Sequence, residues 1–170
     1  RRWFLYERVR CRGDRLDDVS IVITSGSLLR ASAFQALGGF REDFFIDYVD
    51  TEYCLRALSR GYRIVVACNA KLEHRLGDRT REQRGPFVLY PTGHSPTRWY
   101  YISRNRIPML RMYALRFPHW LTFEIAASAF WLLRMLIAED LRAEKVRAVL
   151  RGTWDGLRGR MGPMPGSIEV

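Results

Sequence analysis

Three carboxylates, Asp47, Asp50 and Glu52, lie within six residues at the start of a predicted helix. Aromatic neighbours partly remove water from them, and desolvation raises a carboxylate's pKa towards the pH at which it can take a proton from a hydroxyl. The cluster is therefore a candidate general base. The structural alternative, to which the residues alone give equal weight, is that Asp50 only caps the helix by accepting backbone N–H bonds.

Two further sites combine small or ligating residues with predicted strand ends. Ser25, Gly26 and Ser27 follow a short strand, where glycine permits close approach to a ligand and the hydroxyls can donate hydrogen bonds. An ordinary turn explains the same residues. His74 follows the next strand, and a lone histidine is more often structural than a metal ligand.

A basic and aromatic stretch offers a third kind of site. His94, Arg98, Tyr101 and Arg104 can bind a phosphate or a lipid headgroup through charge-assisted hydrogen bonds. A stretch of this composition can equally bind single-stranded nucleic acid. The chain also carries a formal charge of +10 and a pI near 10.1, which favours anionic partners without choosing among them.

The elements that position these residues follow from hydrophobic spacing and glycine stops. Their order is strand, helix, helix, strand, which predicts the second half of an α/β domain with active residues at the strand ends. Two strands are marginal alone, so we expect this segment to pair with strands from elsewhere. The predicted elements are a strand at Ser20–Thr24, a helix from Leu28 to Leu37 ended by Gly38 and Gly39, a helix at Thr51–Arg60 ended by Gly61, and a buried strand at Tyr62–Ala67.

The second half of the sequence predicts helices after a long loop. The loop covers Arg75–Thr97, and helices are expected at Tyr100–Tyr113 and Leu121–Arg151. We expect residues 1–113 to be the C-terminal part of a catalytic domain and residues 114–170 to form a helical tail that can associate with a membrane.

The stretch Leu121–Ala138 is apolar and close to membrane-spanning length. Its charges Glu124 and Arg134 argue against spanning, so a helix lying in the membrane interface is expected. An amphipathic helix packed on the core is the equally weighted alternative.

The cysteines predict neither a disulfide framework nor a zinc site. Cys11, Cys54 and Cys68 are odd in number, widely spaced and outside any C-x-x-C pair. A reducing cytoplasm is the simplest location. The chain opens without the apolar run of a signal peptide.

Several ordered motifs resemble the family-two, GT-A-fold rhamnosyltransferases. The resemblance extends over about Ser20 to Gly77, and a second similar patch runs from His94 to Asn105. Each short motif is weak alone, but their order makes the set specific. The motifs are Ile23-Thr24-Ser25-Gly26-Ser27-Leu28, Gly38-Gly39-Phe40 through Asp50-Thr51-Glu52, His74-Arg75-Leu76-Gly77, and His94-Ser95-Pro96 through Arg104-Asn105.

The resemblance implies an inverting transfer in which Asp50 is the base that deprotonates the acceptor hydroxyl. Many relatives have Glu-Asp where this chain has Val49-Asp50. Substrate binding is assigned to Ser25, Gly26, Ser27, Asp47, Glu52, His94, Arg98 and Tyr101. Arg56, one helical turn after Glu52, can pair with it.

A divalent metal, Mg or Mn, is implied as cofactor with His74 as a ligand, although the acidic D-x-D partner is absent from the sequence. The implied fold is the C-terminal half of a GT-A domain followed by amphipathic helices. The implied donor is a nucleotide sugar, dTDP-rhamnose, and the implied acceptor is a cell-surface glycan or a lipid-linked glycan.

Such a half lacks the donor-binding part and should be inactive alone. The expected location is the cytoplasm, at the inner face of the cell membrane. The alternative is a non-catalytic basic module that binds a membrane surface or nucleic acid, although no specific nucleic-acid motif is found.

Overall fold

The computed structural model describes residues 9–11, 13–73, 82–84, 87–89 and 93–164, and the chain divides into two compact units. The first unit is Arg8–Glu73 with Met161–Val170, and the second is Arg1–Glu7 with His74–Arg160. Each unit is described by itself. The predicted boundary at residue 113 stays a prediction, and it falls between two helices of the second unit.

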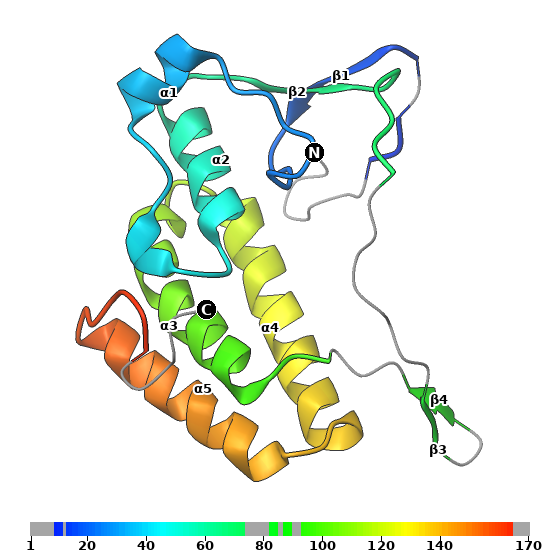
Figure 1. Ribbon diagram of the computed structural model, residues 1–170, viewed down its shortest axis with the longest axis vertical. Helices are drawn as coiled ribbons and strands as arrows, with labels where there is room; N and C mark the ends of the chain where they lie inside the picture. Colours follow the sequence, from blue (N-terminus) through cyan, green and yellow to red (C-terminus); the bar gives the residue numbers. More distant parts are fainter. Residues whose placement is uncertain (1–8, 12, 74–81, 85–86, 90–92, 165–170) are drawn as a thin grey trace. The chain divides into compact units, whose positions relative to one another are not determined.

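In its described residues, the first unit contains two strands, two α-helices and one 3₁₀ turn. Figure 1 shows how these elements follow one another. Strands β1 and β2 pair antiparallel, with Arg15 opposite Ala67 and Leu16 opposite Val66. Their register is irregular before Val19, which lies opposite Ile64. The elements are β1 (Arg15–Val19), α1 (Ala31–Leu37), η1 (Glu42–Phe44), α2 (Val49–Ser59) and β2 (Ile64–Ala67).

The strand predicted at Ser20–Thr24 is wrong, because the strand that pairs with β2 is Arg15–Val19. Residues 21–24 are β-branched but run beside α2 instead, where the carbonyl of Val22 accepts from the thiol of Cys54 at 3.6 Å. The strand predicted at Tyr62–Ala67 is shorter, and its residues alternate between half-buried and exposed. A two-stranded ribbon leaves one face open, which explains why β2 is not buried.

The prediction of no disulfide is also wrong. Cys11 and Cys68 form a disulfide, while Cys54 is free and buried. The two cysteines come together because β1 and β2 run antiparallel, so residues 57 positions apart in sequence meet beside the ribbon. The pairing removes the cysteine-based argument for a reducing cytoplasm, and the location stays a prediction.

A small aromatic core joins α1 to α2. Leu37, Tyr53 and Ala57 are buried, and the rings of Phe34 and Phe40 pack against them. The Phe40 and Tyr53 ring centroids are 4.8 Å apart. This core fixes α2, and with it the predicted carboxylate cluster, against the end of α1.

The second unit is mostly helical (Figure 1). Its two short strands form an antiparallel hairpin within the predicted loop Arg75–Thr97. The predicted helix Leu121–Arg151 is wrong in extent, since it is two helices separated at Leu141, which has left-handed backbone angles. The elements are β3 (Glu82–Arg84), β4 (Phe87–Leu89), α3 (Pro96–Tyr113), α4 (Pro118–Ala138) and α5 (Arg142–Leu157).

Helices α3 and α5 pack closely because α5 presents glycines to α3. A Cβ atom placed on Gly152 would lie 2.2 Å from the carbonyl oxygen of Tyr100, and one on Gly156 would lie 2.5 Å from that of Arg104. The Tyr100 hydroxyl also donates to Asp155 at 3.0 Å. Four-residue glycine spacing therefore lets the two helix backbones touch.

Candidate functional site

The loop that leads into α2 has an unusual backbone. Phe45, Asp47 and Tyr48 all have positive φ, at 63°, 62° and 64°, although none is glycine. Left-handed conformations cost a non-glycine residue about 1 kcal/mol or more and gather at functional sites. Phe44 is fully buried and anchors this loop. The strain fixes the direction in which the chain enters α2, whose second residue is Asp50.

Asp50 does not cap α2. The capping residue is Tyr48, whose side chain makes no cap hydrogen bond, so the capping alternative for Asp50 is excluded. Asp50 is half-buried in the first turn, where the helix dipole favours a negative charge. Among the residues that the structure describes, the Asp50 carboxylate has no hydrogen bond or ion pair. Its oxygens therefore keep lone pairs with which to accept a proton.

Cys54 lies one helical turn after Asp50 and is 5% exposed. Burial raises the pKa of the Cys54 thiol, and the nearby Asp50 charge raises it further, against a lowering by its hydrogen bond to Val22. The thiol is therefore protonated at neutral pH, and it lies near the Asp50 carboxylate.

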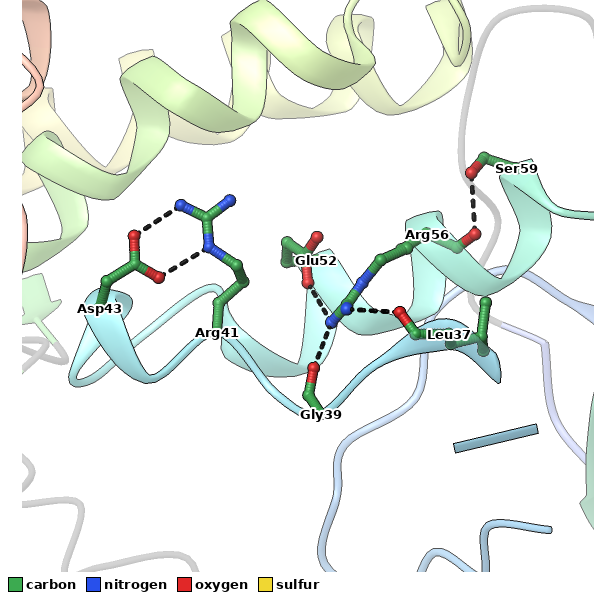
Figure 2. Close-up of polar contacts among 7 residues, drawn as sticks. All are labelled: Leu37, Gly39, Arg41, Asp43, Glu52, Arg56 and Ser59. Carbon is green, nitrogen blue, oxygen red and sulfur yellow. Dashed lines mark hydrogen bonds and ion pairs between the residues drawn. The ribbon is translucent and has the colours of Figure 1, made fainter. Parts of the chain in front are cut away.

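Glu52 has a different environment from Asp50, because it is paired with Arg56 (Figure 2). It is 1% exposed, and its Oε2 accepts from Arg56 Nη2 at 2.9 Å, which confirms the predicted pairing. Arg56 also donates to the carbonyl oxygens of Leu37 at 3.0 Å and Gly39 at 2.7 Å. One guanidinium thus ties α2 to the end of α1, and a role for Glu52 in acceptor binding stays a prediction.

A second arginine pair steadies the segment between α1 and α2. Arg41 donates through Nε and Nη2 to the two carboxylate oxygens of Asp43, both at 2.6 Å (Figure 2). Its guanidinium also lies 4.7 Å from the ring centroid of Phe44. Because Phe44 anchors the strained loop, this pair indirectly supports the entry into α2.

Ser25, Gly26 and Ser27 form an exposed turn. The Ser27 amide donates to Thr24 O at 2.9 Å, and the Ser27 hydroxyl donates to Ile23 O at 2.6 Å. Gly26 has a φ of 75°, and a Cβ there would lie 2.9 Å from Leu72 Cδ2. The structure shows the turn, and substrate binding by these residues stays a prediction.

The predicted metal ligand, His74, lies outside the described residues. Those that are described contain no group of three or more His, Cys, Asp or Glu side chains able to hold a metal ion. This part of the chain therefore does not provide a complete donor set for a divalent metal.

The predicted phosphate-binding residues belong to the second unit, at the start of α3. Ser95 caps this helix by accepting from the Arg98 amide at 3.2 Å. The side chain of Arg98 is exposed, whereas Tyr101 is 1% exposed and its ring centroid lies 4.7 Å from the Arg104 guanidinium. The ring of His94 meets Trp99 edge-on. Because Asp50 lies in the other unit, a joint site stays a prediction.

The sequence did not predict three features of the structure. The positive φ values before α2 carry little sequence signal, because Phe and Tyr rarely adopt them and a single Asp, although enriched there, does not specify them. The double carbonyl contact of Arg56 depends on where α1 ends. The glycines at 152 and 156 did have a signal in their spacing.

Two comparisons with known proteins found sequences similar to this chain. The family described as glycosyl transferase family group 2 matches residues 6–150. A dTDP-rhamnosyl transferase of Shigella flexneri, RfbF, is 33% identical over 144 residues, which are 84% of this chain and 47% of that protein. The chain thus spans about half the length of this curated relative. No solved structure matches the chain.

Proposed function

Because this chain belongs to glycosyl transferase family group 2, we propose that it supplies the catalytic base and the acceptor side of an inverting glycosyltransferase. The observation that carries the proposal is the state of the Asp50 carboxylate. It is half-buried at a helix start and without a partner among the described residues, whereas Glu52 and Asp43 are held by arginines. A base must keep its oxygens available, and Asp50 does.

In the proposed reaction, an Asp50 oxygen accepts the proton of the acceptor hydroxyl as that oxygen attacks the anomeric carbon of the donor. The new glycosidic bond forms while the bond from the anomeric carbon to the diphosphate breaks, and the nucleoside diphosphate leaves with the electron pair. The attack from the opposite face inverts the anomeric configuration.

We assign the donor as dTDP-rhamnose and the acceptor as a glycan or lipid-linked glycan, because the matched relative is a dTDP-rhamnosyl transferase. The other proposed substrate contacts are Asp47, the turn at residues 25–27, and His94 and Arg98, whose cationic and aromatic chemistry suits a phosphate-bearing substrate. Glu52 and Tyr101 are each 1% exposed, so their proposed part is to support the site and not to touch the substrate.

The test is Asp50→Asn in a protein that also carries the donor-binding half. The amide cannot accept the proton, so transfer should fall at least about 100-fold while calorimetric donor affinity stays unchanged. The matched control is Asp18→Asn, since Asp18 is an exposed carboxylate of the same unit and asparagine tolerates its positive φ. Transfer by Asp50→Asn near the parent rate would remove Asp50 from the mechanism.

We also propose that His74 contributes one nitrogen ligand to a divalent metal ion, with the remaining ligands outside the described residues. His74→Ala should then raise the Mn²⁺ concentration needed for half-maximal metal binding, measured by calorimetry. If His74→Ala leaves the metal titration unchanged, His74 is not a metal ligand.

A further inference from the structure

Helix α4 carries a long apolar face that the described residues of the second unit leave uncovered. Six of its side chains are each between 46% and 61% exposed. The helix has 21 residues, its most apolar window has a mean hydropathy of 1.6, and 17% of that window is buried. We call this surface the α4 outer face, formed by Phe123, Ile125, Phe130, Leu133, Leu136 and Ile137.

The polar side chains Thr122, Glu124 and Ser128 of α4 have partners within the protein. Glu124 is 8% exposed, and its Oε1 accepts from Arg106 Nε at 2.9 Å and from the Ser128 hydroxyl at 3.1 Å. The Thr122 hydroxyl donates to the Pro118 carbonyl at 3.0 Å. A surface next to lipid requires such internal pairing, because hydrocarbon offers no hydrogen bonds.

Positive charge lies at the end of the same helix. The guanidinium of Arg134 lies 5.3 Å from the ring centroid of Trp131. Arg142 donates to the carbonyls of Ile137 at 3.0 Å and Glu139 at 2.8 Å, which keeps its charge at the C-terminus of α4. The acidic Glu139 nearby is neutralised by Lys145 at 2.7 Å. An apolar face bordered by arginine and tryptophan matches the chemistry of an anionic lipid surface.

We propose that the α4 outer face docks onto an anionic lipid bilayer, with α4 lying in the interface of one leaflet. By length and composition α4 could also cross a membrane. However, its ion pair with Arg106 ties it to α3, and α3 carries further arginines at positions 104 and 111. Taking these charges into hydrocarbon is costly, so only the outer face enters the bilayer. This inference does not depend on the proposed transfer reaction.

The first experiment measures co-sedimentation of the chain with phosphatidylcholine vesicles with and without 30% phosphatidylglycerol. Binding should be stronger to the anionic vesicles and should weaken as salt rises. The variant Phe130→Gln with Leu133→Gln should lower binding at least about tenfold, because two apolar side chains that enter the lipid are lost. The matched control is Leu28→Gln with Val65→Gln, which changes two exposed apolar residues of the other unit.

A second measurement places a tryptophan on the outer face and so needs no polar substitution. Lipids brominated in the acyl chain should quench the fluorescence of a chain carrying Phe130→Trp more strongly than that of the parent chain. Equal quenching of the two chains, or equal binding by the outer-face and control variants, would overturn the proposal.

Two other occupants of the face have distinct signatures. If a second copy of the chain covers it, size-exclusion chromatography without lipid will show a dimer that the outer-face variant converts to a monomer. If α4 spans the bilayer, the protein will stay with cell membranes after carbonate extraction. Either result would overturn the proposal that α4 docks in the membrane interface.

Discussion

Asp50 and Glu52 show how two carboxylates in one helical turn can have different functions. Glu52 is fixed by Arg56 in a buried ion pair, whereas Asp50 is half-buried with no partner among the described residues. An ion pair of this kind uses a carboxylate for stability and withholds it from proton transfer. The environment, more than the residue type, therefore distinguishes the candidate base from its neighbour.

The buried thiol beside Asp50 gives a pH-dependent prediction. Because the folded-state pKa of Cys54 is raised, its stabilising contribution is present below the unfolded pKa and is lost as pH rises through the folded value. The difference in unfolding free energy between the parent and Cys54→Ser should therefore shrink as pH is raised above about 8.5. Urea denaturation at several pH values measures it, and a difference that stays constant would contradict it.

At the residue scale, the sequence located the carboxylates but not their roles. The spacing of Asp47, Asp50 and Glu52 predicted a cluster at a helix start, and α2 confirms this position. It did not predict which carboxylate is paired, because the orientation of each depends on the left-handed turn at Asp47 and Tyr48. That conformation is imposed by tertiary packing, because Tyr rarely adopts it and the enrichment of Asp in it is too weak to predict it.

At the scale of elements, Arg56 should contribute strongly to the stability of the first unit. Arg56→Leu leaves Glu52 charged, buried and unpaired and frees two carbonyls, so the unfolding free energy should fall by about 3 kcal/mol. The matched control is Arg15→Leu, which breaks the exposed Arg15–Asp17 pair and should cost under about 1 kcal/mol. Chemical denaturation measures both variants. Similar losses of unfolding free energy would show that the buried pair contributes no more to stability than the exposed pair.

The α3–α5 contact gives a second prediction for an element. Gly152→Ala places a methyl group against the Tyr100 carbonyl, so it should destabilise the second unit by about 2 kcal/mol, despite the better helix propensity of alanine. Thr153→Ala on the same helix should change stability by less than about 1 kcal/mol. Thermal unfolding followed by circular dichroism compares them. A Gly152→Ala chain as stable as the parent would mean that the helices can separate at little cost.

Helices were predicted better than strands because their signals are local. Glycine stops correctly placed the ends of α1 and α2, where Gly38 and Gly61 have φ of 82°. The strand at Ser20–Thr24 was wrong because β-branched residues favour extended backbone without specifying a partner. The pairing of β1 with β2 is a long-range choice, and the Cys11–Cys68 link depends on it.

At the scale of the whole molecule, we predict that this chain alone binds sugar nucleotides poorly and has no transfer activity. The chain spans about half of its curated relative, the sequence has no D-x-D pair, and the described strands form only two-stranded ribbons. A base is of no use until the donor is held beside it. Calorimetry with dTDP-rhamnose should therefore show binding only when the donor half is supplied. Tight binding or turnover by this chain would contradict the prediction.

The Cys11–Cys68 bond also makes a covalent ring out of most of the first unit. The ring contains the serine turn, α1 and α2, and hence Asp50, within one closed stretch of backbone. A single protease nick after the exposed Arg30 would open this ring without releasing a fragment. Such a nicked protein should migrate as one species on a non-reducing gel and as two pieces after reduction. Cleavage at this position would thus leave the candidate base and the turn joined in one molecule.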